Sequence, residues 1–383
     1  MISIKGNALI GSNLAFFQNV RIEIDDEGII TDISKDQKLA DYILPASFII
    51  IPGFVNGHVH VGDAFLKDFS FGFTLDKAVG PNGVKNKKLS ESSTIEKMES
   101  IENSLNLLIQ NGYTTFVDFR EEGIVGIKLL KNILEKHPIR GIILGRKTET
   151  DTYREVSDVC EGLGLRDVFE LNEIEWEIIS EIKNYNPSML LGIHVSESEE
   201  VINESLKIFG ESDLSLASNY GFLDFVVHAN YANEKELRIL KQNGINIICC
   251  PISSAYFGLK YPPLGDIQNN NILLGLGTDN ILTSNPDPFR LMAFTLYESR
   301  RYNQRISPID VLKAITVNMG KILGRKIGQI DVGYSGDLIA LNLDSYNLKF
   351  SRDVYTAITM RADSSDICFQ IYKGKVVKWK NLK

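Results

Sequence analysis

The sequence of 383 residues lacks an excess of positive charge, a cysteine framework and long apolar runs, and each shortage excludes a class of protein. Its 41 Lys and Arg are outnumbered by 49 Asp and Glu, so the net charge is −8 and the basic stripe of a nucleic-acid binder is missing. The four cysteines form no Cys-x-x-Cys pair, which indicates reduced thiols. No signal-peptide pattern and no uncharged apolar run of about 18 residues is present. We therefore expect a cytoplasmic protein that binds neither nucleic acid nor a membrane.

Both ends of the chain carry short stretches with strand character, in which apolar and polar side chains alternate. These stretches are residues 20–24, 29–33, 337–343, 367–372 and 376–379. Neither end holds enough apolar residues for a core of its own. We therefore expect residues 1–51 and 331–383 to pack together as one small composite β-sandwich domain.

Between the two ends, short apolar segments alternate with amphipathic segments of helix length. The strand candidates are residues 54–60, 115–119, 139–144, 190–194, 225–228, 245–250 and 272–276. The helix candidates are residues 92–111, 123–136, 172–185, 198–209, 233–243 and 307–323. This alternation is typical of βαβ units with a parallel sheet, and it favours an α/β fold with a TIM-type (β/α)8 barrel over residues 52–330. An eighth strand is expected near residues 156–163.

The segment 62–90 fits neither pattern. It follows the first predicted barrel strand and is rich in phenylalanine, glycine and lysine. Long irregular segments in this position are often lids over an active site, whereas the alternative is a plain excursion of the chain. We expect a lid.

Histidine is scarce, with five copies, and four of them end predicted strands. His58 and His60 are two residues apart on one strand, so their side chains point to the same face. His194, His228 and Asp279 each end a further strand. Because all strands of a parallel barrel end at one face, where active sites lie, these side chains are expected to converge. Imidazole nitrogens and a carboxylate are good ligands for a divalent metal ion.

Other polar residues have simpler interpretations. The fifth histidine, His137, precedes a proline at a predicted helix end and is interpreted as a partner of the helix dipole. Asp63, Asp118, Arg120 and Glu121 follow the first two barrel strands and could line a pocket, but we interpret them as structural or solvated side chains.

The ordered motifs resemble those of the amidohydrolase superfamily. They are the nonapeptide 52–60 that ends in His58-Val-His60, the stretch His194-Val-Ser-Glu197, His228, and Gly-Thr-Asp279. The resemblance covers nearly the whole chain and is greatest to the branch of cytosine deaminase, chlorohydrolases and S-adenosylhomocysteine deaminase. It is specific for the superfamily and its metal site but not for a substrate.

The resemblance implies that His58, His60 and His194 hold one divalent metal ion and that Asp279 is a further ligand. Zinc is the expected ion, and iron or manganese would also suit such ligands.

The same resemblance assigns the catalytic roles. Asp279 would take a proton from the water that the metal activates, His228 would orient this water, and Glu197 would be the proton shuttle of the deaminase branch. Glu197 stands three residues after a metal ligand, and this spacing is typical of the deaminases with a single metal ion.

Two residues help to decide which branch of the superfamily the sequence resembles. Binuclear relatives carry a carboxylated lysine after the fourth strand, but Lys147 follows the third predicted strand, so we interpret it as a surface or substrate-side cation. Ser254 stands where the related Cys-Pro-x-Ser-Asn motif has asparagine, which leaves open whether this position contacts substrate. Turn formation beside Pro251 is the simpler interpretation of Ser253 and Ser254.

The sequence therefore predicts a metal-dependent hydrolytic deaminase of an amino-substituted heterocycle such as a pyrimidine, a purine or a related nucleoside base. The expected partner is this small heterocyclic substrate, and a homodimer is compatible with the sequence. Hydrolysis of a cyclic amide or of a chlorinated triazine at the same site is the first alternative. A catalytically silent barrel is the second, and the complete set of ligands and acid–base residues argues against it.

Overall fold

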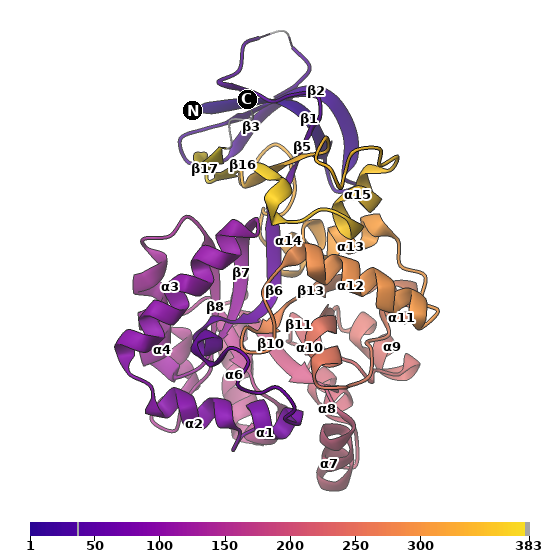
Figure 1. Cartoon of the computed structure of the whole chain (residues 1–383). Coiled ribbons are helices and arrows are strands. Elements are labelled where there is room, and N and C mark those ends of the chain that lie inside the picture. Colours follow the sequence, from indigo (N-terminus) through magenta and orange to yellow (C-terminus); the bar gives the residue numbers. More distant parts are fainter. Residues whose placement is uncertain (37, 380–383) are drawn as a thin grey trace.

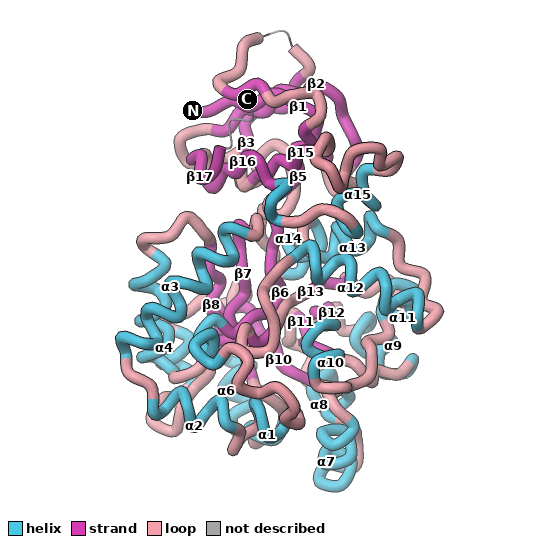
Figure 2. Tube along the Cα trace, viewed as in Figure 1, coloured by secondary structure: helices cyan, strands magenta, loops and turns pink. Residues whose placement is uncertain are grey.

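The computed structural model describes residues 1–36 and 38–379. The chain forms a barrel and, at one end of it, a smaller sheet that contains both termini (Figure 1). Residues 37 and 380–383, which the expected terminal domain includes, lie outside the described residues. Figure 2 shows the strands gathered at the centre of the larger part, with helices around them.

The larger part is a parallel barrel, as predicted. Its strands are β6 (Phe54–His60), β7 (Tyr113–Arg120), β8 (Arg140–Gly145), β9 (Gly162–Leu165), β10 (Leu190–Val195), β11 (Phe225–His228), β12 (Asn246–Cys249), β13 (Leu274–Leu276) and β14 (Asp279–Asn280). Hydrogen bonds join them in the order β13-β12-β11-β10-β9-β8-β7-β6-β14. Because β14 directly follows β13 in the chain and pairs with β6, the sheet closes on itself.

The fourth barrel strand lies later than expected. The segment predicted as a strand, residues 156–163, starts within helix α5 (Tyr153–Ser157). A capping box formed by Thr152 and Glu155 stabilises the start of this helix. The strand itself, β9, has the sequence Gly-Leu-Gly-Leu. Glycine is a weak signal for a strand, but here it is needed because a Cβ on Gly164 would lie 2.6 Å from the ring of Phe119. The additional strand that was predicted near residues 156–163 therefore exists, as the fourth barrel strand in chain order. The prediction placed it a few residues too early.

Five of the six predicted helices form as expected. They are α3 (Thr94–Gln110), α4 (Gly123–Leu134), α6 (Glu173–Tyr185), α7 (Glu199–Phe209) and α9 (Glu234–Gln242). The sixth is broken at Thr316, whose backbone is not helical, into α13 (Pro308–Ala314) and α14 (Val317–Ile322). Further barrel elements that the sequence did not reveal include α8 (Asp213–Asn219), α10 (Pro251–Tyr256), α11 (Leu264–Asn269), α12 (Pro288–Arg301) and η2 (Val168–Glu170). Among the described residues, no helix combines the length and apolarity that crossing a membrane requires.

The segment after β6 is more regular than the sequence suggested. It contains the short helices η1 (Val61–Leu66), α1 (Leu75–Val79) and α2 (Val84–Glu91). Thr74 caps α1 with its hydroxyl group, but no side chain caps η1 or α2. Helices this short lack the periodic pattern by which a sequence reveals them. We call residues 61–91 the strap.

The strands of both chain ends form one mixed sheet, as expected for a small composite β domain. Its strands are β1 (Ile2–Ile10), β2 (Ala15–Ile24), β3 (Ile30–Ser34), β4 (Tyr42–Ile43), β5 (Phe48–Pro52), β15 (Leu338–Asn342), β16 (Ile367–Tyr372) and β17 (Lys375–Trp379). Antiparallel pairing of β5 with β15 joins the two ends of the chain. The sheet has its own core, which includes Ile22, Ile50 and Phe369. Between β15 and β16 lie α15 (Val354–Met360), which packs against α12 and α13, and η3 (Ser364–Asp366).

An ion pair joins the terminal sheet to the start of the barrel strands. Arg140, at the beginning of β8, donates to Asp337 Oδ2 at 2.7 Å and to the hydroxyl groups of Thr115 and Ser335. The other oxygen of Asp337 accepts from the backbone N–H of Lys373 at 2.9 Å. The Asp337 side chain is buried, so its charge depends on these donors. The terminal sheet therefore sits at the end of the barrel where the strands begin.

Replacing Asp337 by alanine should lower the free energy of unfolding by about 2–3 kcal/mol, because Arg140 loses a charged acceptor in a largely buried place. Urea denaturation would measure the change. The matched control is Asp344→Ala, since Asp344 pairs with Lys349 at 3.0 Å on the surface and should contribute less than about 1 kcal/mol. Equal losses in the two variants would contradict this account of the junction.

Candidate metal centre and active site

The five predicted strand-end residues lie together at the end of the barrel opposite the terminal sheet. His58 and His60 are on β6, His194 is on β10, and His228 is the last residue of β11. Asp279 begins β14, which pairs with β6 so that Asp279 is opposite Val59. All five are buried or nearly so. The barrel therefore brings together residues that are up to 221 positions apart in the chain, from His58 to Asp279.

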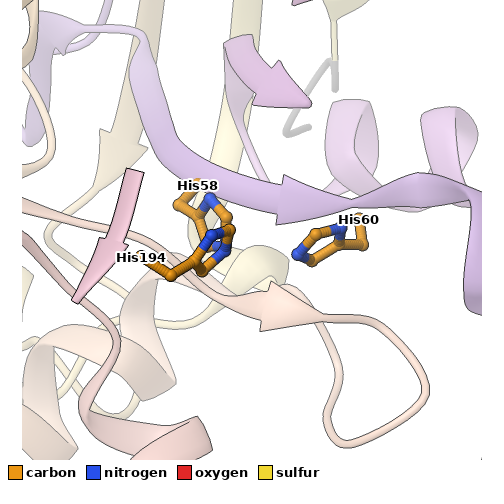
Figure 3. A group of neighbouring side chains, drawn as sticks. All are labelled: His58, His60 and His194. Atoms are coloured by element: carbon orange, nitrogen blue, oxygen red, sulfur yellow. The ribbon is translucent and has the colours of Figure 1, made fainter. Parts of the chain in front are cut away.

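The ring nitrogens converge on one small space. His58 Nε2 lies 3.2 Å from His194 Nε2 and 3.3 Å from Asp279 Oδ1, and His60 Nε2 lies 3.5 Å from the same oxygen. One ligand atom from each of His58, His60 and His194 lies within 4.8 Å of the others, and the same holds for His58, His228 and Asp279. Figure 3 shows the rings of the first trio close together beside β6.

The hydrogen bonds of two rings leave the converging nitrogens free to bind a metal. His60 Nδ1 lies 3.1 Å from the carbonyl oxygen of Phe119, and His194 Nδ1 lies 3.0 Å from that of Leu165. A carbonyl oxygen only accepts, so each Nδ1 carries the proton and each Nε2 presents a lone pair. This is the usual arrangement around a histidine ligand, and the residues present therefore fit a divalent ion.

The charges of the cluster also suit a metal. Burial, opposed in part by the contact with Asp279, lowers the pKa of His58 to about 3. Burial likewise lowers the pKa of His60 to about 4 and that of His194 well below its usual value. Burial opposes ionisation of Asp279, but the surrounding histidines, His58 first, hold its pKa well below the usual value. At neutral pH the site therefore offers three neutral imidazoles and one carboxylate.

Two hydrogen bonds hold the Asp279 carboxylate. Ser253 Oγ donates to Oδ2 at 2.5 Å, and Asn280 Nδ2 donates to Oδ1 at 2.9 Å. The backbone of Asp279 is left-handed, with φ of +61°, a conformation that non-glycine residues adopt at a cost. Ser253 lies on α10, 26 residues earlier. The interpretation of Ser253 as a turn residue was therefore incomplete, since its hydroxyl orients the carboxylate.

Glu197 and His228 form a second pair beside the histidine cluster. Their closest atoms, Glu197 Oε1 and His228 Nε2, are 3.4 Å apart. Asn230 Nδ2 donates to the backbone carbonyl of Glu197 at 2.9 Å, and Ser254 Oγ donates to Asn230 Oδ1 at 3.1 Å. Ser254 therefore contacts a residue that holds the Glu197 backbone. Burial raises the pKa of Glu197, with His228 opposing, so the carboxyl group holds a proton more readily than an exposed one.

A cavity of about 870 Å³ opens at this end of the barrel, within the range of small-molecule sites. Its lining includes His60, His194, Glu197, His228 and Asp279. The strap supplies one wall with residues 74–76 and 79–81, together with Lys85. The strap thus borders the cavity, as expected of a lid, and whether it opens and closes stays a prediction.

The remaining interpretations are placed as follows. Lys147 pairs with Glu175 at 3.2 Å and is absent from the lining of the cavity, which agrees with a surface cation and not with a substrate-side one. His137 Nδ1 lies 3.0 Å from the carbonyl oxygen of Ile133 in the last turn of α4, as predicted. Glu121 is buried behind His60, with its Oε1 2.7 Å from His60 Nδ1.

Asp63, Asp118 and Arg120 are also buried beneath the site, so the structural interpretation is correct for them. The backbone N–H of Leu282 donates to Asp63, and that of Val61 donates to Asp118. Burial raises the pKa of Asp63 to about 7, although a nearby lysine opposes the shift.

The sequence did not reveal that Lys85 and Asn280 belong to this site. Lys85 lies in the strap, where the chain shows no periodic pattern, and its position could not be derived. Asn280 directly follows Asp279, and this position next to a predicted ligand was the only sequence signal that could have assigned Asn280 to the site.

The chain is similar to several known proteins. Residues 49–377 match the model of the amidohydrolase family. A protein of Methanothermobacter thermautotrophicus named "Putative aminohydrolase" is 32% identical over 367 residues, which are 92% of this chain and 93% of the relative. The 5-methylthioadenosine/S-adenosylhomocysteine deaminase of Thermoanaerobacter pseudethanolicus is 24% identical, over 94% of this chain and 88% of the relative. It lies in the branch that the sequence motifs resemble.

The fold also matches a solved structure. The adenosine deaminase of Xanthomonas campestris, with bound zinc, superposes with a TM-score of 0.87 at 16% identity. The match covers 100% of this chain and 94% of that protein. At this identity the likeness establishes the shared fold.

His60→Ala should remove most of the bound metal, because the substitution removes one of the converging nitrogens, on a ring that the carbonyl oxygen of Phe119 holds in place. Elemental analysis after dialysis should fall from about one divalent ion per chain to near zero. His137→Ala is the control, since the ring of His137 is hydrogen-bonded to the end of α4 and does not belong to the histidine cluster, and this variant should keep the ion. A full complement of metal in His60→Ala would contradict the assignment of the site.

Proposed function

The chain belongs to the amidohydrolase family, and on this premise we propose that it is a metal-dependent hydrolase that replaces the amino group of a heterocycle with oxygen and releases ammonia. The observation that carries the proposal is the pair of Glu197 and His228 at 3.4 Å, next to a histidine cluster with converging lone pairs. The deaminase relatives support the same reaction.

His58, His60, His194 and Asp279 would hold one divalent ion. Such an ion supplies Lewis acidity, which makes water acidic enough to lose a proton near neutral pH. Zinc is our first choice because the matching adenosine deaminase structure contains it. Iron and manganese also suit imidazole and carboxylate ligands.

Asp279 would act as the base that takes a proton from the attacking water. Its carboxylate is ionised, and Ser253 and Asn280 fix its plane by donating to its two oxygens. A base that is held in place loses little entropy when the reaction begins. His228, whose left-handed backbone has φ of +71°, would hold the water by its ring nitrogen.

Glu197 would carry the proton to the substrate. Its raised pKa lets the carboxyl group donate to a ring nitrogen as water adds to the adjacent carbon. The carboxylate that remains can then receive the proton of the added oxygen and pass it to the departing amino group. The proton that Asp279 took from water returns to Glu197, which restores both carboxyl groups. Ammonia leaves, and the ring carbon keeps a carbonyl oxygen, so atoms and charges balance.

The cavity supports a substrate larger than a bare ring. Its volume of about 870 Å³ leaves room for a heterocycle and an attached group. The lining combines apolar side chains, such as Leu75 and Phe257, with charged ones, such as Arg146 and Glu200. A purine or pyrimidine with a polar substituent, including a nucleoside, fits this combination best.

A screen for ammonia release would test the proposal. Aminated pyrimidines, purines, their nucleosides and aminotriazines should be offered to protein of measured metal content. We expect release from at least one class, in proportion to the bound metal. Chloride release from chlorotriazines, or ring opening of cyclic amides, without ammonia from any amine would favour the alternative leaving groups.

Glu197→Gln should keep the metal and lose about 10²–10⁴-fold in the rate of ammonia release, because the amide cannot transfer a proton. Steady-state kinetics with the best substrate of the screen would measure the loss. Glu177→Gln is the control, since Glu177 is exposed on α6 outside the cavity, and it should be as active as the wild type. Equal turnover of Glu197→Gln and the wild type would disprove the assigned role.

A further inference from the structure

A buried lysine of the strap reaches the rear of the candidate metal centre. Lys85, on α2, is 4% exposed. Its ammonium group lies 2.5 Å from Glu121 Oε1, donates to Asn280 Oδ1 at 2.8 Å and lies 3.5 Å from Asp63 Oδ2. The ammonium group therefore makes one hydrogen bond, to Asn280, and ion-pair contacts with two carboxylate groups.

Two of these partners contact predicted metal ligands. Glu121 Oε1, the oxygen next to Lys85, is also 2.7 Å from His60 Nδ1. Asn280 accepts from Lys85 through Oδ1 and donates to Asp279 through Nδ2. The ammonium group of Lys85 therefore contacts both Glu121, which supports His60, and Asn280, which supports Asp279.

The contact with Asn280 decides which way its amide faces. Because the oxygen of the amide points at Lys85, the NH₂ group must point at the Asp279 carboxylate. Without the lysine, rotation of the amide would place its oxygen against the negative carboxylate. Lys85 thus keeps a donor on the oxygen of Asp279 that faces His58 and His60.

The contact with Glu121 keeps a negative charge behind His60. The ammonium group balances the carboxylate charge in a place where both side chains are buried. A carboxylate oxygen 2.7 Å from Nδ1, next to the carbonyl oxygen of Phe119 at 3.1 Å, makes the ring a stronger electron donor at Nε2, the nitrogen that faces the cluster. Without Lys85, Glu121 Oε1 would lose its cation, and the Arg120 guanidinium would remain 3.9 Å from the other carboxylate oxygen, Oε2.

Stability alone does not account for this arrangement. Taking a lysine and a glutamate out of water carries a desolvation cost that their attraction often fails to offset. The next lysine on the same helix, Lys87, is exposed, as is usual for this residue. The strap has other attachments to the barrel, including a hydrogen bond between Ser70 and Tyr256 at 3.0 Å.

We propose that Lys85 is a positioning residue that couples the seating of the strap to the orientation of His60 and Asp279. With α2 in place, Lys85 fixes Glu121 behind His60 and Asn280 behind Asp279. A substrate that packs against the strap wall of the cavity, at Leu75 and Val79 of α1, would hold α1 and, through the contact of α1 with α2, also Lys85. It would thereby complete the metal centre. The inference rests on the metal centre of the proposed function and extends it to a residue outside the ligand set.

Zinc affinity of the substrate-free protein tests the proposal without relying on activity. Competition with a chromophoric chelator would give the Kd of zinc for the wild type, Lys85→Met, Lys85→Arg and Lys87→Met. We expect Lys85→Met to raise the Kd about 10–100-fold, as loss of support behind a ligand does. Lys85→Arg keeps the cation and should recover part of the affinity, and Lys87→Met, on the same helix, should match the wild type.

Two further measurements separate this role from a merely structural one. The visible absorption spectrum of the cobalt-substituted protein reports ligand geometry, and it should change in Lys85→Met but not in Lys87→Met. If Lys85→Met does not fold, Glu121→Gln removes the same support and should raise the zinc Kd about 10–100-fold. Combining the two substitutions in a folded protein should cost less than the sum of the single losses, because they act on one chain of contacts.

The outcomes distinguish the two proposals. An unchanged zinc Kd in folded Lys85→Met, or in Glu121→Gln where only that variant folds, would overturn the role of Lys85 and leave the proposed function standing. If Lys85→Met binds zinc more weakly but the wild type releases ammonia from no amine, the role of Lys85 would be supported and the proposed deaminase activity would be contradicted. Failure of the wild type to bind zinc would overturn the inference together with the metal centre.

Discussion

The pairing of β14 with β6 is the constraint on which the site depends. It places Asp279 opposite Val59 and Asn280 opposite His60, so the carboxylate lies between the two histidines of β6. The approach is close, since a Cβ on Gly277 would lie 2.7 Å from the His58 backbone. Asn56 and Thr278 join the same two segments by a side-chain hydrogen bond at 2.7 Å. Barrel closure and assembly of the candidate metal site are therefore one event.

The electrostatics of the site follow from this closure. Three imidazoles crowded in a buried space cannot all be charged, and burial keeps them neutral. Their Nε2 atoms and the Asp279 carboxylate converge, with distances of 3.2 to 3.5 Å from His58 Nε2 to His194 Nε2 and from Asp279 Oδ1 to His58 and His60. Without a cation such a cluster would be unfavourable, because the electronegative atoms of the rings and of the carboxylate face one another at short distance. A cation relieves the repulsion, and this is the physical reason for interpreting the cluster as a metal site.

The sequence predicted what short-range patterns encode. Period-two spacing placed His58 and His60 on one face, and the alternation of strands and helices placed His194 and His228 at strand ends. It placed β9 a few residues too early, because glycine is a weak strand signal and Gly164 is required by its packing against Phe119, a tertiary contact. It also could not reveal contacts between distant residues, such as Ser253 with Asp279, or Lys85 with Asn280 across 195 positions. Those depend on tertiary structure that no local pattern specifies.

The chemistry and the walls of the cavity come from different parts of the chain. Strand ends hold the nitrogens and the carboxylate, whereas the strap and the start of α7 border the space where substrate would lie. In many barrels such loops can vary without disturbing the strand ends. Here the buried Lys85 joins the two, so a change in the strap also alters the support of His60 and Asp279. The choice of substrate and the strength of metal binding are consequently linked in this protein.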